Sequence, residues 1–330
     1  MKNIVLIGCG RIGKMHFDNL AIIDSINVKY IVDDYINADD FSEVIVKKAS
    51  QLEEVLSDDQ VDACVIAASS SAHVDLIKKA IDFRKHIFCE KPISFDVNAL
   101  NELAHLVKEA NLKLQVGLNR RFDPDFLALK NAIDKQKIGS IQIIKITNRD
   151  PRRPDLKFVG KSGGLFFDFN THDFDMVHFL SGERVKEVYA IGDALIESRL
   201  KELGDIDTTL ITLKLDSGAL VMIDASRETN FGYDQRIEVF GSKGMLKVDN
   251  FSPTNVSCIS SNNLQQSQLP YWSFVERYHQ AYLNEFKAFA DYLNASDDVG
   301  SPVGIDDMIQ SVEVAMAVQR SYDNNQAIVL

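Results

Sequence analysis

The alternation of strand and helix patterns over residues 1–118 limits the fold more than any other feature of this chain. Short, continuously apolar runs at 4–7, 28–32, 63–68, 87–89 and 114–117 are typical of strands that are buried on both faces of a parallel sheet. Helical patterns separate most of these runs, for example at 72–83 and 95–111. A repeated strand, helix and strand with right-handed crossovers predicts a doubly wound parallel sheet.

One connection departs from this alternation. Only the segment YINADDFSE separates the second expected strand from the apolar residues 44–46. This is short for a complete crossover helix, so we expect a loop or a single helical turn beside the predicted adenosine site.

The pattern changes after about residue 119. A helix is expected over 126–138, and apolar and polar residues then alternate over 141–148 and 208–227. The DSG at 216–218 is a hairpin signal, and 236–248 predicts a second hairpin. Amphipathic helices are expected over 273–294 and 305–324, and the polar segment 257–268 is expected to be an exposed loop. We therefore expect an α/β chain of two domains. Residues 1–118 form the doubly wound sheet, and residues 119–330 form an α/β domain with a large, mostly antiparallel open sheet that has one exposed face.

Charge and cysteine usage narrow the class of partner. The net charge of −12 disfavours nucleic acids and acidic membranes as partners, and the sequence has no run that could span a bilayer.

No two of the four cysteines stand at metal-ligand or redox spacing, and three lie in apolar runs. Buried, reduced thiols are typical of a reducing compartment, so we expect a cytoplasmic protein without a metal site.

A glycine-rich turn follows the first strand. The sequence GCGRIG places Gly8, Gly10 and Gly13 at the spacing of a dinucleotide-binding motif, directly before a helix. Here the helix N-terminus would hold a pyrophosphate, and we expect Arg11 and Ile12 to contact the cofactor as well. Asp33 ends the second strand, where a carboxylate binds ribose hydroxyls and repels a 2′-phosphate. NAD is therefore favoured over NADP, although the neighbouring Asp34 competes for this role.

Polar residues also follow the next strand, in AASSSAH. Ligands of open α/β sheets lie at the carboxyl ends of strands, so Ser69, Ser70 and His73 are candidates for cofactor contact. Capping of the next helix by Ser71 explains the same pattern without a ligand.

The segment HIFCEKPIS ends an apolar strand with Glu90, Lys91 and Pro92. A surface strand end with a turn proline is the simplest interpretation. In a chain with a nucleotide motif, however, the strand end points toward the expected nicotinamide. We therefore expect Glu90 to contact the cofactor and Lys91 to act on a substrate oxygen. Pro92 would fix the backbone there, and a cis peptide bond is one way to do so.

A second polar cluster lies in GGLFFDFNTHDFDMVHFL, residues 163–180. Asp168 and His172 are four residues apart and would share a face of a helix, which Asp175 joins. Among so many apolar residues these groups need partners. A core histidine with a capping aspartate would also satisfy the pattern, and we assign His178 to such a structural role.

Five segments together resemble the Gfo/Idh/MocA oxidoreductases, most closely the myo-inositol 2-dehydrogenase branch, over nearly the whole chain. They are GCGRIGKMH, IFCEKPIS, LNRRFDP, SGGLFFDFNTHDFDM and GYDQRIEVFGSKGML. The resemblance implies a Rossmann domain, a second domain whose open sheet forms homo-oligomers (tetramers or dimers), and a catalytic set of Lys91, Asp168 and His172. It further implies substrate contacts for Lys91, His172, Asn119, Arg120, Asp150, Asp175 and Tyr233. Asn119 stands where branch members often have Met, and Arg84 replaces a usual glycine.

The implied reaction is the NAD-dependent oxidation of a secondary alcohol of a cyclic polyol to a ketone, with myo-inositol as the leading substrate. His172 would accept the hydroxyl proton, Asp168 would hold the imidazole, and Lys91 would stabilise the developing alkoxide, so no metal is required. Three alternatives stay open. They are a related scyllo-inositol or aldose dehydrogenase, an NAD-dependent glycosidase, and a non-catalytic NAD-binding sensor.

Overall fold

The computed structural model describes residues 1–41, 44–254, 256–259, 261, 265–296 and 298–330. These residues form two compact units. The first consists of Met1–Asn119 and Ala281–Ile309, and the second of Arg120–Gln280 and Gln310–Leu330. The sequence-based division between 118 and 119 thus lies one residue before the change of unit, but the first unit also takes in Ala281–Ile309.

The first unit contains a six-stranded parallel sheet of order β3-β2-β1-β4-β5-β6. This is the order expected of a doubly wound nucleotide-binding sheet, and it confirms the prediction from the strand and helix alternation. Its strands are β1 Lys2–Ile7, β2 Ile26–Val32, β3 Ile45–Lys47, β4 Ala63–Ile66, β5 His86–Glu90 and β6 Leu114–Gly117. Because the chain reverses its direction of winding between β1 and β4, the loops after these two strands lie at the switch point.

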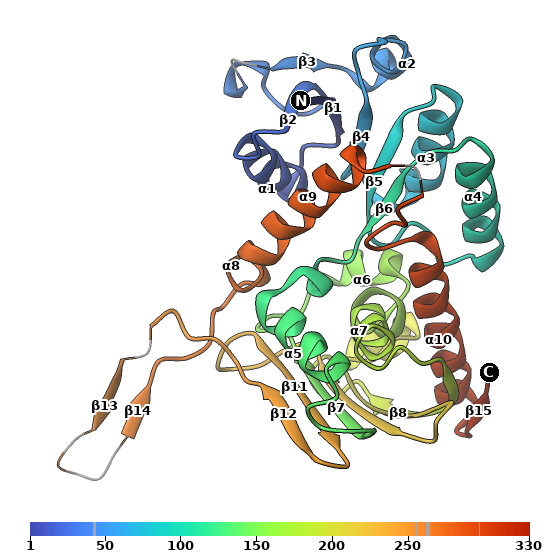
Figure 1. Cartoon of the computed structure of the whole chain (residues 1–330). Coiled ribbons are helices and arrows are strands. Elements are labelled where there is room, and N and C mark those ends of the chain that lie inside the picture. Colours follow the sequence, from blue (N-terminus) through green and yellow to red (C-terminus); the bar gives the residue numbers. More distant parts are fainter. Residues whose placement is uncertain (42–43, 255, 260, 262–264, 297) are drawn as a thin grey trace. The chain divides into compact units, whose positions relative to one another are not determined.

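Five helices accompany this sheet (Figure 1): α1 Arg11–Ala21, α2 Leu52–Leu56, α3 His73–Asp82, α4 Val97–Glu109 and most of α9 His279–Asn294. One face of the sheet packs against α1 and α9. Leu20 of α1 and Phe286 and Phe289 of α9 form one apolar cluster with strand residues such as Leu6 and Phe88. The rings of Phe88 and Phe286 lie 4.6 Å apart. This packing explains why a segment so late in the chain belongs to the first unit.

The short connection after β2 contains a single 3-10 turn, Ala38–Asp40, before β3. The helical-turn alternative is therefore confirmed. Ser42 and Glu43 of the same connection lie outside the described residues.

The second unit is built on a seven-stranded sheet of order β12-β11-β7-β10-β9-β8-β15. β10 pairs with β7 in parallel, and the other neighbouring pairs are antiparallel, as predicted. The sequence patterns identified β7, β9, β10, β11 and β12, but not β8 or the edge strand β15. The strands are β7 Ile141–Arg149, β8 Val185–Asp193, β9 Thr208–Leu215, β10 Leu220–Ser226, β11 Asp234–Gly241, β12 Gly244–Val248 and β15 Ile328–Val329.

Helices cover one face of this sheet, and α7 lies over β7 (Figure 1). Burial alternates along β9 and β10, so the opposite face carries exposed side chains. The helices of the second unit are α5 Pro124–Asp134, α6 Leu156–Ser162, α7 Thr171–Ser181, α8 Phe274–Arg277 and, from Gln310 on, α10 Ile305–Asn324. No helix of the described residues combines the length and apolar character that a membrane span requires.

Two predictions for the second half need correction. The helix expected over 273–294 is divided into α8 and α9 at Tyr278, whose ring is buried against Arg120 and Tyr233. The loop expected over 257–268 instead contains a paired ribbon of β13 Ser257–Ile259 and β14 Gln265–Ser267 (Figure 1). The side chains of β13 are exposed, so this strand leaves no hydrophobic pattern in the sequence. Ser260 and residues 262–264 lie outside the described part of the chain.

Candidate functional site

The glycine turn after β1 is fixed by close backbone packing. Gly8 has a φ of +87°, and a Cβ there would lie 2.7 Å from the Ala68 backbone. A Cβ on Gly13 would lie 2.1 Å from the carbonyl oxygen of Gly8. Side chains are therefore excluded at both positions, because the loops after β1 and β4 and the start of α1 approach so closely.

Gly10 has a different role from the other two glycines. It is the N-cap of α1, no side chain caps this end, and the first turn has no acidic residue. A Cβ on Gly10 would meet no atom within 4 Å. The first N–H groups of α1 and the space in front of them thus fit the pyrophosphate of a dinucleotide.

The two acids after β2 are separated by their hydrogen bonds. The carboxylate of Asp33 accepts from the backbone N–H of Cys9 at 2.8 Å and from that of Tyr35 at 2.7 Å. Asp34 instead accepts from the backbone N–H of Ala49 at 2.9 Å. Asp33 is therefore the acid that lies against the glycine turn, and Asp34 stabilises the connection after β3.

The candidates that follow β4 have two kinds of environment. Ser69 and Ser70 are exposed at the start of a 3-10 turn, next to Ala68 and the glycine turn. His73 is buried instead, and its ring nitrogens lie 2.8 Å from the carbonyl oxygen of Pro92 and 3.1 Å from that of Ala68. His73 thus links the loops after β4 and β5.

The end of β5 carries the predicted Glu-Lys-Pro sequence. The Lys91–Pro92 peptide bond is cis. The carboxylate of Glu90 accepts from the backbone N–H of Lys91 at 3.1 Å, and its other oxygen lies 2.7 Å from Nε2 of His16. The strand end that carries Lys91 is thus tied to α1 through Glu90.

Asp168 and His172 lie on two different helical elements of the second unit. Asp168 belongs to a π-helical turn, Leu165–Phe169, and His172 to the first turn of α7. The period of 3.6 residues that we assumed between them does not apply across this turn. Gly163 and Gly164, both with positive φ, precede the π-helical turn and allow the chain to enter it.

The open sheet brings other candidate residues to the same end of the second unit. Asp150 directly follows β7, and the pairing of Arg149 with Asp234 places Tyr233 opposite it. Arg227 directly follows β10, which runs parallel to β7. Burial raises the pKa of the Tyr233 phenol well above its ordinary value, and the charge of Asp150 contributes to this rise.

Arg227 connects this end of the sheet to the π-helical turn. Its guanidinium lies 3.5 Å from the carboxylate of Asp168 and 3.3 Å from that of Asp205. Arg227 is almost completely buried, so both acids are held by one buried cation. Sequence reasoning identified Asp168 but missed Arg227 and Asp205, because they are distant in the sequence.

Arg120 and Asp175, for which substrate contacts were predicted, each belong to a buried ion pair. Arg120 donates to Asp173 at 2.8 Å, and Arg121 donates to both carboxylate oxygens of Asp175, the shortest distance being 2.6 Å. Asp173 also accepts from Asn148 and Asn170. These two ion pairs join the segment after β6 to α7, and they had no counterpart among the predicted contacts.

Asn119 is the last residue of the first unit and is buried. Its amide nitrogen donates to no acceptor among the described residues. Such a donor fits a bound hydroxyl or an ordered water molecule.

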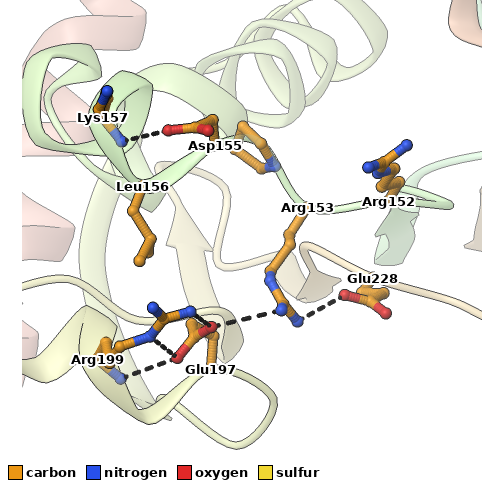
Figure 2. Close-up of a pocket in the computed structure, with 9 residues that line it drawn as sticks. Arg152, Arg153, Asp155, Leu156, Lys157, Glu197, Arg199 and Glu228 are labelled. Atoms are coloured by element: carbon orange, nitrogen blue, oxygen red, sulfur yellow. Dashed lines mark hydrogen bonds and ion pairs between the residues drawn. The ribbon is translucent and has the colours of Figure 1, made fainter.

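A pocket follows Asp150 in the second unit. Figure 2 shows Arg153 pointing between Glu197 and Glu228, to which it forms ion pairs at 3.4 and 3.0 Å. Arg199 also pairs with Glu197, which lowers the pKa of that carboxyl to about 2. Each of these two arginines thus has an acidic partner. None of the predicted site residues lines the pocket. The residues that line it are Arg152, Arg153, Pro154, Asp155, Leu156, Lys157, Glu197, Arg199 and Glu228.

The glycine turn, Asp33 and the doubly wound sheet define a dinucleotide-binding protein with a second, mixed-sheet unit. Residues 2–118 match the family model of oxidoreductases with an NAD-binding Rossmann fold, and residues 126–247 match the GFO/IDH/MocA C-terminal domain. The chain belongs to the Gfo/Idh/MocA family of oxidoreductases.

Three similar proteins illustrate the relationship. The chain is 41% identical to the uncharacterized oxidoreductase YrbE of Bacillus subtilis, over 97% of this chain and 94% of that protein. It is 36% identical to the myo-inositol 2-dehydrogenase of Thermotoga maritima, over 99% and 98% of the two chains. Scyllo-inositol dehydrogenase from Lactobacillus casei, whose structure was solved with NAD(H) and scyllo-inositol, is 27% identical to this chain. The match covers 100% of this chain and 99% of that chain, with a TM-score of 0.90.

Proposed function

We propose that this chain catalyses the NAD-dependent oxidation of a secondary alcohol of a cyclic polyol to the ketone, with myo-inositol as the leading substrate. One observation carries the proposal. The chain has Lys91, Asp168 and His172, and it matches a myo-inositol 2-dehydrogenase over almost its entire length. The related scyllo-inositol enzyme supports the same substrate class but a different ring stereochemistry.

The residues of the first unit support NAD as the cofactor. NAD, when bound, supplies the hydride acceptor for the oxidation. The N-terminus of α1 beyond Gly10 would hold its pyrophosphate, and Ser69 and Ser70 are exposed beside this turn. A carboxylate at Asp33, already oriented by the amide of Cys9, would accept ribose hydroxyls and repel a 2′-phosphate. This favours NAD over NADP.

Three side chains have distinct roles in the proposed reaction. His172 accepts the hydroxyl proton as the general base, and Lys91 stabilises the negative charge that develops on the substrate oxygen. Asp168 stabilises the imidazolium that forms on His172, and the buried cation Arg227 holds Asp168 in place. The alkoxide is stabilised by the ammonium of Lys91, so the proposed mechanism needs no metal ion.

The remaining polar residues would recognise the hydroxyl groups of the polyol. Asn119 has a buried donor, and Asp150 and Tyr233 face each other at the end of the open sheet. Arg120 and Asp175 are engaged in buried ion pairs, so we assign them contacts that leave these pairs intact. Several fixed donors and acceptors suit a ring with many hydroxyls better than a simple alcohol.

A polyol panel tests the proposed activity. The purified protein is incubated with myo-inositol, scyllo-inositol, common aldoses and a chromogenic glycoside, each with NAD and with NADP. The formation of NADH or NADPH and the release of the chromogenic leaving group are measured. We expect the highest kcat/KM with an inositol and NAD. Higher kcat/KM with an aldose would support the sugar dehydrogenase. Release of a leaving group from a glycoside without net NADH would support the glycosidase. NAD binding without turnover of any substrate would support the sensor.

We also propose that the chain forms a homo-oligomer through the open face of the seven-stranded sheet. Large apolar side chains on neighbouring strands are exposed there, and exposed apolar patches of this kind favour protein association. They are Tyr189, Ile191, Leu210, Leu220, Met222 and Phe240. Light scattering of the purified protein should give the mass of a dimer or tetramer, and a monomer would contradict this.

We further propose that the protein is located in the reducing cytoplasm. The buried free thiols Cys9, Cys64 and Cys89 support this location.

A further inference from the structure

The side chain of Glu90 packs within the first unit and is 14% exposed. One carboxylate oxygen lies 2.7 Å from Nε2 of His16, and the other accepts the backbone N–H of Lys91 at 3.1 Å. Gly117 lies opposite Glu90 on β6, and a Cβ there would come within 3.1 Å of the carboxyl carbon. The absence of a side chain at 117 thus lets Glu90 lie against β6 and reach both partners.

A second carboxyl, that of Glu285, is buried on the same side of the sheet. Glu285 lies on α9 and has no solvent exposure. Its backbone carbonyl accepts from the side chain of Gln115 at 3.2 Å. Gln115 and Gly117 are two residues apart on β6, so they face the same side. Glu285 and Glu90 therefore approach the same region, from α9 and from β5.

The two carboxyls differ in their partners. Neither oxygen of Glu285 has a hydrogen-bond partner among the described residues. The groups that face this region are His16 of α1, Glu90 of β5 and Tyr282 of α9, and His16 also contacts the ring of Phe286 at 4.7 Å. No described cation pairs with Glu285. An ionised carboxylate in such a place is strongly disfavoured, and two neighbouring carboxyls in one buried site do not both ionise.

We propose that Glu285 is the neutral carboxylic acid in this core and that it acts as a positioning residue for Lys91. Glu90 is then the only anion of the pair, and it stays bonded to the amide of Lys91 and to His16. A charge on Glu285 would repel Glu90 and weaken the bond that fixes the strand end. Burial raises the pKa of the Glu285 carboxyl well above its ordinary value, and the charge of Glu90 adds to this, in agreement with the geometry. The link to turnover rests on the proposed function of Lys91, whereas the charge state of Glu285 does not.

Infrared spectroscopy tests the charge state directly. At pH 8 the wild-type protein should show the carbonyl stretch of a protonated carboxylic acid, and Glu285→Gln should remove it. The same change at the exposed Glu313 on α10 is the matched control and should leave the band in place. A wild-type spectrum without this band, or a band that persists in Glu285→Gln, would overturn the proposal.

Amide hydrogen exchange and kinetics test the positioning. Glu90→Gln, which has one acceptor oxygen in place of two, should speed exchange of the Lys91 amide by about tenfold or more. It should also lower kcat by a similar factor. Glu285→Gln, a neutral isostere, should keep both the slow exchange and the wild-type kcat. Unchanged exchange in Glu90→Gln, or exchange accelerated by Glu285→Gln, would contradict the role assigned here. If the wild-type protein oxidises no polyol, the proposed function fails while the infrared and exchange results still decide this inference.

Discussion

A Cβ on Gly13 would lie 2.1 Å from the carbonyl oxygen of Gly8, whereas a Cβ on Gly10 would meet no atom within 4 Å. The first contact is part of the fold, and the second position is open space at the helix N-terminus. The glycines of one motif therefore have separable roles.

Alanine substitutions should separate these roles. Gly13→Ala must displace backbone and should lower the Tm clearly or prevent folding. Gly10→Ala should leave the Tm nearly unchanged but raise the Kd for NAD about tenfold or more, because its methyl group takes the space of the pyrophosphate. Thermal unfolding and NAD titration measure both effects. A Gly10→Ala protein that binds NAD as tightly as the wild type would contradict the assignment of this space to the cofactor.

Asp33 should determine the choice between NAD and NADP. Asp33→Ser removes the charge that repels a 2′-phosphate, so the ratio of kcat/KM for NAD to that for NADP should fall by about tenfold or more. Asp34→Ser is the matched control, since Asp34 bonds to the backbone of Ala49 and not to the glycine turn. An equal loss of discrimination in both variants would show that the structure does not distinguish the two acids as we state.

The buried pair of Arg120 and Asp173 should be important for stability. Asp173→Ala leaves the buried guanidinium without its carboxylate, which should cost about 3–5 kcal/mol of unfolding free energy. The exposed Asp291→Ala on α9 should change stability by less than about 0.5 kcal/mol. Urea denaturation measures both values. A small loss in Asp173→Ala would mean that the buried pair is not maintained in solution.

The charge state of Glu285 affects how the stability of the folded protein depends on pH. An unfolded glutamate releases its proton near its ordinary pKa of 4.5, whereas the folded protein keeps the proton at Glu285 because burial raises this pKa. The folded state then binds more protons, so this group's stabilising contribution is complete at low pH and decreases as the pH rises above 4.5. The decrease is at most about 1.4 kcal/mol per pH unit. Glu285→Gln does not titrate, so its stability relative to the wild type should increase between about pH 5 and 8. A constant difference across this range, measured by urea denaturation, would argue against a retained proton.

The local patterns of the sequence were enough to predict the doubly wound sheet. Apolar runs such as residues 4–7 and 63–66 are buried on both faces, so each one carries the signal of a central parallel strand. The hairpin of β9 and β10 was equally clear, because burial alternates along both strands and DSG forms the turn. The glycine motif and the Glu-Lys-Pro sequence fall at strand ends, where ligands of such sheets bind.

The rest depends on contacts between distant residues. Nothing in the local pattern of α9 indicates that Phe286 packs on Phe88 and so joins the first unit. The partners of Asp173 and Asp168 come from β7, the residue after β10 and the segment after β6, which become neighbours only through the fold. The π-helical turn at Asp168 depends on two glycines with positive φ, and helical periodicity does not predict it.

The role of Lys91 is the central claim, and one comparison tests it most directly. NAD binding and NADH formation from myo-inositol are measured for the wild type, Lys91→Ala and, as a control, Lys78→Ala on the exposed face of α3. Lys91→Ala should bind NAD with an unchanged Kd and lose turnover by about 10²-fold or more, while Lys78→Ala keeps both. Turnover at the wild-type rate in Lys91→Ala would contradict the account.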